Sequence, residues 1–371
     1  MDYRTKLFVY SKLYDHTGTD FLFVNAIRKN TAYHRRHCPA YAAILSQQKL
    51  NLRKIKAVND LYKIPVLPTL YLKNHKLWSM SEEKIFWKAT SSGTRGKKSQ
   101  IGFDFKSLSY GAFMVIRAAA YHKLLSLKPV NYIILGYKPD HSNHSIASKA
   151  AFGATFFAPA IHLEYALNPT SGGYQPDLKG PKNAILKYAR QPFPVRLIGF
   201  PAYTYFLLNE FKKDGIHLKL HPDSMVLLGG GWKEFDTEKV DKAELYTLIT
   251  DVLGIPEKNC REFYGAIEHP IIYYSCKNHH FHVPSYSRVI VRDVKTLLPV
   301  KNGTIGLINL LTPMVESMPL VSIMTDDLGI LHDGNECGCG INTPYFEVIG
   351  RVGIHDIKTC AAGANELLEN H

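Results

Sequence analysis

Residues 225–233 read Met-Val-Leu-Leu-Gly-Gly-Gly-Trp-Lys, an apolar run that ends in three consecutive glycines. The apolar part, Met225–Leu228, has the length of a buried strand. Glycines directly after a strand let the backbone come close to a flat or charged ligand, although an ordinary strand-to-helix turn uses them too. The stretch therefore predicts a strand followed by a loop, with ligand binding and a plain turn both left open.

Runs of the same kind occur on both sides of this stretch, separated by segments with helical spacing of apolar residues. The other predicted strands are Tyr132–Leu135, Arg196–Ile198, Ser287–Val291 and Gly306–Leu310. The predicted helices are Tyr41–Val58, Ser107–Leu127 with Ser107 as its N-cap, and Ala202–Lys213. Alternation of strands and helices predicts an α/β fold. Without an internal repeat or a linker, we expect one body over residues 1–341 and a short C-terminal segment over 342–371.

Composition sets limits on the class of protein. The chain has 371 residues, 46% of them hydrophobic, which is enough for a packed core. Its apolar runs are too short to span a membrane, and its N-terminus has no export signal, so we expect a cytoplasmic protein with no membrane span. The net charge of +13 suits an anionic nucleotide, an acyl carboxylate or an acidic partner. No nucleic-acid-binding motif accompanies the charge, and we expect no nucleic acid partner.

The segment Thr90–Ser99 reads Thr-Ser-Ser-Gly-Thr-Arg-Gly-Lys-Lys-Ser and combines hydroxyls, glycines and cations. Glycines let backbone amides converge on phosphate oxygens, hydroxyls add donors, and Lys or Arg offsets the charge. Gly93 and Gly96 are too close together for a Walker A loop. The segment predicts a phosphate-binding loop, with a surface turn as the alternative.

This loop resembles the phosphate loop of the adenylate-forming enzymes. The matching residues are Ser91, Ser92, Gly93, Thr94 and Gly96. Arg95 replaces a threonine of the family pattern, and Lys97 and Lys98 come slightly before the position of the family's lysine. The resemblance implies that one of these two lysines meets the phosphates of ATP.

Four later segments resemble the family's motifs in the same order along the chain. Gly229-Gly230-Gly231-Trp232 resembles the segment that packs on adenine, and Tyr264-Gly265-Ala266-Ile267-Glu268 resembles the motif in which the aromatic residue lies against adenine and the glutamate holds Mg²⁺. Asp327 matches the aspartate that binds the ribose, and Arg351 matches an arginine that reaches the nucleotide. Ile267 stands where the family has threonine.

Within this superfamily the chain most resembles the acyl-protein synthetases of bacterial fatty-acid reductase complexes, in the branch of the phenylacetate-coenzyme A ligases. The segments that carry this resemblance are Ile64–Thr69, Leu197–Pro201 and Leu228–Lys233. The resemblance implies the large α/β N-terminal body of such an enzyme. It also implies an ATP-dependent ligase that converts a carboxylic acid, in particular a fatty acid, to acyl-AMP and passes the acyl group to a protein thiol, with a reductase or another acceptor protein as partner.

The chain ends 20 residues after Arg351, so we expect the C-terminal domain of the coenzyme A ligases to be missing. In the synthetases that the chain resembles, a cysteine at this distance from the end accepts the acyl group, and Cys360 is the matching residue. Lys358 or His355 could increase its thiolate fraction. The alternative for Cys360 is a buried structural cysteine in a final helix.

A second set of residues has the ligand types of a zinc site. Cys276 precedes His282 by six positions, and Cys337-Gly338-Cys339 follows later. Three cysteines and one histidine form a closed structural zinc shell, and related ligases carry a comparable set. The competing ligands are His279 and His280, and the alternative is loop residues without metal. Cys38 and Cys260 have no such pattern, and we expect them in the core.

Three functional alternatives remain at this point. The first is a phenylacetate-type acyl-coenzyme A ligase, and the second is a nucleotide-binding protein without turnover. The third is a zinc-dependent nucleic acid binder.

Overall fold

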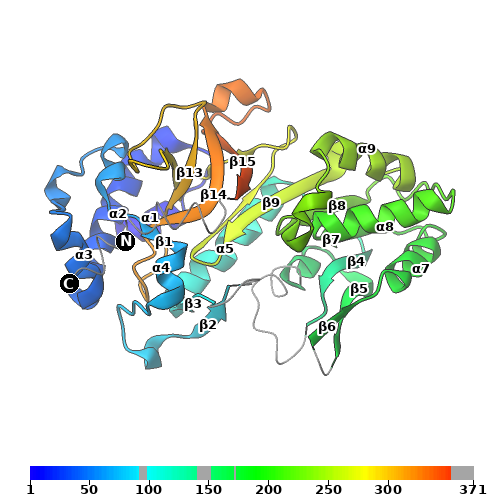
Figure 1. Ribbon diagram of the computed structural model, residues 1–371, viewed down its shortest axis with the longest axis horizontal. Helices are drawn as coiled ribbons and strands as arrows, with labels where there is room; N and C mark the ends of the chain where they lie inside the picture. The colour runs from blue at the N-terminus through cyan, green and yellow to red at the C-terminus, as the bar shows by residue number, and fades with distance from the viewer. Residues whose placement is uncertain (92–97, 140–151, 171–172, 352–371) are drawn as a thin grey trace. The chain divides into compact units, whose positions relative to one another are not determined.

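The computed structural model describes residues 1–91, 98–139, 152–170 and 173–351. The chain divides into two compact units (Figure 1). One unit contains Met1–Ala118, Gly265–Tyr273 and His280–His371, and the other contains Ala119–Tyr264 and Tyr274–His279. We refer to them as the first and the second unit. Among the described residues, no helix has the length and apolar character needed to cross a membrane.

The first unit contains an antiparallel sheet in the order β11-β15-β14-β13-β12, and β1 pairs with β14 in parallel. Its strands are β1 (Leu67–Pro68), β11 (Phe281–His282), β12 (Arg288–Arg292), β13 (Ile305–Leu311), β14 (Ser322–His332) and β15 (Tyr345–Arg351). A separate hairpin is formed by β2 (Trp87–Thr90) and β3 (Gln100–Phe103). The α-helices are α1 (Tyr3–Phe8), α2 (His16–His37), α3 (Pro39–Gln47), α4 (Thr69–Asn74) and α5 (Phe105–Tyr121).

The second sheet has the order β10-β9-β8-β7-β4-β5-β6, and all of its neighbours from β9 to β5 are parallel. Its strands are β4 (Val130–Tyr137), β5 (Ala160–Thr170), β6 (Gly173–Pro176), β7 (Val195–Gly199), β8 (Met225–Gly229), β9 (Cys260–Ala266) and β10 (His269–Tyr274). The α-helices α7 (Lys179–Tyr188), α8 (Pro201–Lys213) and α9 (Lys242–Leu253) belong to the second unit. Their apolar faces and the buried strands share one core, because parallel strands must be covered by helices.

The predicted α/β class is confirmed. Four of the five predicted strands lie within observed strands, and the fifth, Ser287–Val291, corresponds to β12 (Arg288–Arg292) with a shift of one residue. The helix predicted over Ala202–Lys213 is confirmed as α8, with Pro201 in its first turn. The domain boundary predicted at residues 341 and 342 stays a prediction. Both cysteines expected in the core, Cys38 and Cys260, are buried.

Two helix predictions were partly wrong. The helix expected over Tyr41–Val58 ends at Gln47, because Lys49 adopts φ of 49°, and a separate 3₁₀ turn follows, in which Asn51 accepts a hydrogen bond from the amide of Arg53. Ser107 is not an N-cap. It lies inside α5, and its amide donates to Asp104 Oδ1 at 2.9 Å, which is the bond expected when Asp104 is the cap. The same helix ends at Tyr121, six residues early, where Lys123 adopts φ of 57°.

Candidate functional site

Asp327 and Arg351 are opposite each other on paired strands of the first unit. The register of β14 and β15 places the two residues as direct partners. Arg351 Nε donates to Asp327 Oδ1 at 3.0 Å, and the aspartate side chain is 12% exposed against 69% for the arginine. The two predicted nucleotide-binding residues are therefore together in space, although 24 positions separate them in the sequence.

Asp326, the residue before Asp327, is held from a distant part of the chain. Leu67 and Pro68 pair in parallel with Ile323 and Met324, so the chain that leaves β1 runs beside the next residues of β14. Thr69 Oγ1 donates to Asp326 Oδ1 at 3.0 Å. The segment Ile64–Thr69, which carries the resemblance to the acyl-protein synthetases, thus contacts Asp326 through Thr69. We refer to Asp326, Asp327 and Glu268 as the acidic region.

Glu268 is a buried carboxylate of the first unit, only 5% exposed. Burial raises the pKa of Glu268, and the negative charge of Asp326 acts in the same direction. Ser99 and Lys73 lower the pKa of Glu268, but burial outweighs them. A carboxylate in such a place gains from a bound cation, because a cation offsets the cost of removing its charge from water. Its chemistry fits the Mg²⁺ ligand that the resemblance implies.

The predicted phosphate loop connects β2 to β3, and its ends lie next to the last strand pair, Thr90 and Gln100. Ser91 N donates to Ser99 O at 3.1 Å, and Ser99 N donates to Ser91 Oγ at 3.0 Å. Ser99 is buried and Lys98 is exposed. The other predicted residues of the loop, Ser92, Gly93, Thr94, Gly96 and Lys97, lie outside the described residues, as does Cys360.

The second unit holds the predicted adenine-binding residues. Gly229 ends β8, and a Cβ added there would lie 2.1 Å from the ring of Phe263 on the neighbouring strand. Gly230 and Gly231 both have positive φ, 81° and 67°, and the space around a Cβ at Gly231 is open. Trp232 follows as a buried side chain beside Tyr205.

The tyrosine motif begins on β9, the strand that pairs with β8. Tyr264 is half-buried on β9, and Gly265 is exposed. Ile267 is buried, so the residue that replaces the family's threonine is an apolar core side chain.

Cys276, His282, Cys337 and Cys339 come together as a possible metal site. Their four ligand atoms all lie within 4.8 Å of one another. His282 Nδ1 lies 2.8 Å from the carbonyl oxygen of Thr343, so this nitrogen carries the proton and donates. The other nitrogen, Nε2, lies 3.2 Å from Cys339 Sγ and is left as the ligand atom. A carbonyl that fixes the histidine tautomer in this way is a common feature of metal sites.

Backbone amides also point at the sulfur atoms. Ile341 N donates to Cys339 Sγ at 3.4 Å, and Asn278 N donates to Cys276 Sγ at 3.3 Å. Such bonds favour the thiolate form that zinc requires. Of the two competing ligands, His280 has Nδ1 3.2 Å from Cys337 Sγ, whereas His279 Nε2 lies 3.0 Å from a Glu257 oxygen. The donor set fits zinc, which prefers thiolate and imidazole in tetrahedral geometry.

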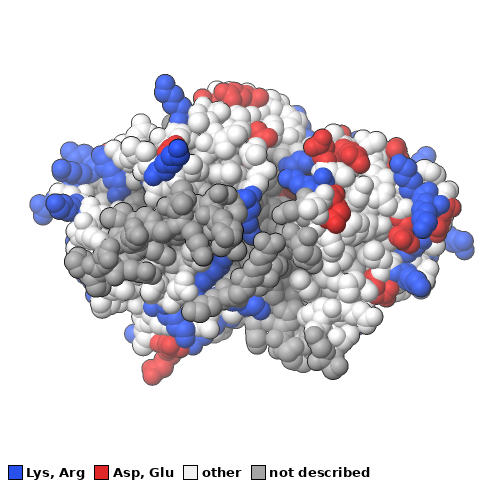
Figure 2. Space-filling model, in the orientation of Figure 1, with Lys and Arg blue, Asp and Glu red and all other residues white. Residues whose placement is uncertain are grey.

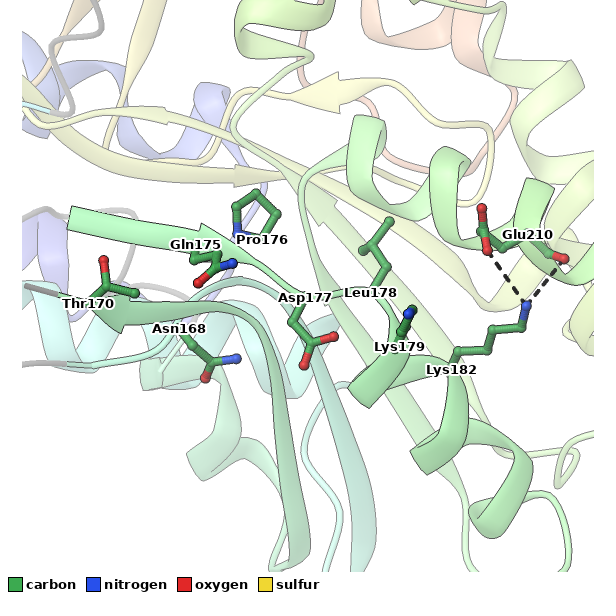
Figure 3. Close-up of a pocket in the computed structure, with 9 residues that line it drawn as sticks. All are labelled: Asn168, Thr170, Gln175, Pro176, Asp177, Leu178, Lys179, Lys182 and Glu210. Carbon is green, nitrogen blue, oxygen red and sulfur yellow. Dashed lines mark hydrogen bonds and ion pairs between the residues drawn. The ribbon is translucent and has the colours of Figure 1, made fainter. Parts of the chain in front are cut away.

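A hollow of about 670 Å³ in the second unit contains none of the predicted site residues (Figure 3). Its lining comes from the ends of β5 and β6 and from α7 and α8. Lys182 of α7 forms ion pairs with two carboxylates of α8. Its Nζ lies 3.7 Å from Glu210 Oε2 and 2.7 Å from Oδ2 of Asp214, the residue that follows the helix. The charge of Lys182 is therefore already balanced by these two carboxylates.

The excess of basic residues does not form one stripe on the face that Figure 2 shows. Lysine and arginine side chains stand there in several separate groups, some of them beside acidic side chains.

Comparison with known proteins identifies the family. The sequence profile of the family described as "Acyl-protein synthetase, LuxE" matches residues 14–369. The chain belongs to the LuxE acyl-protein synthetase family. It is therefore an enzyme of the ligase type, and the predicted family resemblance is confirmed.

Individual relatives of this LuxE family member agree. The long-chain-fatty-acid–luciferin-component ligase of Aliivibrio fischeri is 27% identical over 315 residues, which cover 83% of this chain and 80% of the relative. The corresponding ligase of Vibrio harveyi is 26% identical over 324 residues, which cover 84% of this chain and 80% of the relative. The phenylacetate-coenzyme A ligase of Thermus thermophilus is 24% identical over 324 residues, 85% of this chain and 66% of that protein. The two fatty-acid ligases are more similar to this chain than the phenylacetate-coenzyme A ligase is, so the coenzyme A ligase alternative is not favoured.

The fold is shared with a solved structure of 2-hydroxyisobutyryl-CoA ligase in an open conformation with 2-HIB-AMP and CoA. The TM-score is 0.65 at 13% identity, over 92% of this chain and 71% of that chain. This likeness shows the fold of an adenylate-forming enzyme, as the sequence analysis expected.

Proposed function

We propose that this chain activates a fatty acid with ATP and then carries the acyl group on Cys360. In the first step a carboxylate oxygen of the acid attacks the α-phosphorus of ATP. The bond between that phosphorus and the bridging oxygen breaks, and pyrophosphate leaves with the electron pair. In the second step the Cys360 thiolate attacks the acyl carbon, AMP leaves, and a thioester remains.

One observation carries this proposal. In the acidic region of the first unit, Glu268 is buried and Asp327 is paired with Arg351, and the motifs assign all three residues to the binding of ATP and its Mg²⁺. The chain also belongs to a family of acyl-protein synthetases. Asp327 would accept hydrogen bonds from the ribose, and Arg351 would supply positive charge to the nucleotide. Gly229, Gly230, Gly231, Trp232, Tyr264 and Gly265 would pack on the base.

Two metal ions belong to the proposal, each in a different role. Mg²⁺ would be held by Glu268, and it would supply neutralisation of phosphate charge. Zn²⁺ would be held by Cys276, His282, Cys337 and Cys339, and a closed shell of four protein ligands makes its role structural.

The substrate and the partner follow from the relatives. Two curated relatives are named long-chain-fatty-acid ligases, which favours a fatty acid over a small aromatic acid. Delivery of the acyl group to a reductase or another acceptor protein would occur in the cytoplasm.

The test is incubation with ATP, Mg²⁺ and a panel of radiolabelled acids, with ATP–pyrophosphate exchange and label on the protein as the two measurements. Wild-type protein should exchange pyrophosphate and retain hydroxylamine-labile label. Cys360→Ala should keep the exchange and lose the label, whereas the control Cys38→Ala should keep both. Undiminished label on Cys360→Ala would overturn the acceptor assignment, and absence of exchange with every acid would overturn the adenylation step. Discharge of the adenylate by coenzyme A alone would favour the coenzyme A ligase.

A further inference from the structure

Lys73 is a cation of the first unit to which no motif assigned a role. It lies on α4, the six-residue helix that begins at Thr69 directly after β1. Because β1 pairs with β14, α4 starts beside the middle of that strand, where Thr69 is hydrogen-bonded to Asp326. Residues four apart lie on the same face of a helix, so Lys73 is on the face of α4 that carries Thr69.

The surroundings of Lys73 are acidic. Glu268 and Asp327 are buried, and Asp326 is half-buried. Lys73 acts electrostatically on Glu268, as Asp326 does, so the three charged residues are neighbours. The helical spacing and this electrostatic effect together place Lys73 next to these acidic residues.

The charge of Lys73 has no fixed partner in the part of the chain that the structure describes. No ion pair or hydrogen bond joins its ammonium group to another described side chain, whereas Arg351 is already paired with Asp327. Lys73 is a half-buried residue, and its ammonium group therefore keeps its hydrogen-bond donors for a ligand. Its three N–H groups form a compact point charge that suits phosphate oxygens.

We propose that Lys73 is a further catalytic residue, whose ammonium group binds the phosphate chain of ATP beside Glu268. The inference rests on the proposed adenylation and adds to it a cation from the N-terminal part of the chain. As the bond from the α-phosphorus to pyrophosphate breaks, negative charge increases on the departing oxygens. A fixed cation stabilises that charge more than it stabilises bound ATP, which speeds the step.

The alternative role for Lys73 is a structural counter-ion for Glu268. Both roles predict some change when the charge is removed, but only the catalytic role depends on the β and γ phosphates. AMP lacks those phosphates. The comparison of ATP with AMP therefore separates the two roles.

The test uses the full-length chain with Lys73→Met, which keeps the length of the side chain, and Lys73→Arg, which keeps the charge. Lys76→Met, an exposed lysine just after the same helix, is the matched control. Affinity for ATP and for AMP is measured by calorimetry, ATP–pyrophosphate exchange by isotope, and folding by thermal melting.

We expect Lys73→Met to bind ATP about 10–100-fold more weakly, the loss typical of one charged hydrogen bond, and to bind AMP normally. Its exchange rate should fall about 10²–10³-fold, with melting unchanged. Lys73→Arg should recover part of both losses, and Lys76→Met should match wild type.

Three results would overturn the proposal: equal loss of ATP and AMP affinity, a rise in KM for the acid alone, or a lower melting temperature with normal ATP affinity. If wild type binds ATP but exchanges with no acid, the proposed function fails, and the ATP-to-AMP comparison still decides the role of Lys73.

Discussion

Arg351 Nε donates a hydrogen bond of 3.0 Å to Asp327 Oδ1 across the directly paired strands β14 and β15. The aspartate is buried in the sheet and the arginine is mostly exposed, so the bond fixes the carboxylate from the solvent side. A carboxylate that is already oriented loses little entropy when it binds a ligand. The pair is therefore suited to hold a hydroxyl-bearing group in one orientation.

We predict that Asp327→Asn raises the KM for ATP about 10–100-fold, because the neutral amide forms weaker hydrogen bonds with ribose hydroxyls than a carboxylate does. The kcat of ATP–pyrophosphate exchange should change much less, since the ribose does not react. Steady-state exchange kinetics measure both. Asp251→Asn, an exposed aspartate of α9, is the control and should leave both values unchanged. A fall in kcat without a change in KM would contradict a binding role.

The five strands that the sequence predicted are runs rich in apolar residues, and such a run can be found without information from elsewhere in the chain. Strands that mix polar and apolar residues, such as β9 and β14, were not predicted. The sequence predicted helix ends poorly because these depend on single capping residues. The Asp104 bond that starts α5 and the positive φ of Lys49 that ends α3 were both missed.

In the site, too, features of a single segment could be predicted, whereas contacts between distant segments could not. Motifs identified Asp327 and Arg351 one at a time, but their pairing follows from the register of β14 and β15. Lys73 was missed altogether, because its place beside the acidic region depends on the pairing of β1 with a strand about 250 residues later. A signal was present in the segment Ile64–Thr69, although nothing in that segment says which strand it joins.

Gly229 and Gly231 should respond differently to alanine. A Cβ at Gly229 would collide with the Phe263 ring, so Gly229→Ala should destabilise the protein by about 1–3 kcal/mol or more through overpacking. At Gly231 the space is open and only the positive φ resists a side chain, which costs about 1–2 kcal/mol.

Urea unfolding measures both glycine variants, and Gly215→Ala, with φ of 66° and open space, is the matched control for Gly231. A stability loss at Gly229 no larger than that at Gly231 would contradict the packing described for β8 and β9.

Zinc removal should lower the stability of the chain. Cys339→Ser should lose the bound metal, because a hydroxyl is a poor zinc ligand, and its melting temperature should fall. The control is Cys260→Ser, since that thiol is buried in the second unit and burial raises its pKa to about 12. This control should keep one equivalent of zinc by elemental analysis. Purified wild-type protein without zinc, or full zinc content in Cys339→Ser, would refute the four-ligand site.

Acid should destabilise the protein through His34, a fully buried histidine of α2. Its Nε2 donates to the carbonyl of Val315 at 3.1 Å, and its Nδ1 accepts from the hydroxyl of Ser79 at 2.7 Å, so the ring is neutral. Burial lowers the pKa of His34 to about 3 from 6.5. Below pH 6.5 the unfolded chain therefore binds a proton that the folded chain does not bind. The free energy of unfolding should fall by up to about 1.4 kcal/mol per pH unit between pH 6.5 and 3 from this group.

His34→Gln isolates this contribution. The variant should be about 1–3 kcal/mol less stable at pH 7.5, because the lost bonds are buried, but its stability should fall less steeply as the pH is lowered. Urea unfolding from pH 7.5 to 4.5 measures the two slopes. The carboxylates that titrate in the same range are common to both proteins, so their effect cancels in the difference. His37→Gln, an exposed histidine of the same helix, should keep the wild-type slope. Equal slopes for wild type and His34→Gln would show that His34 is protonated in the folded protein.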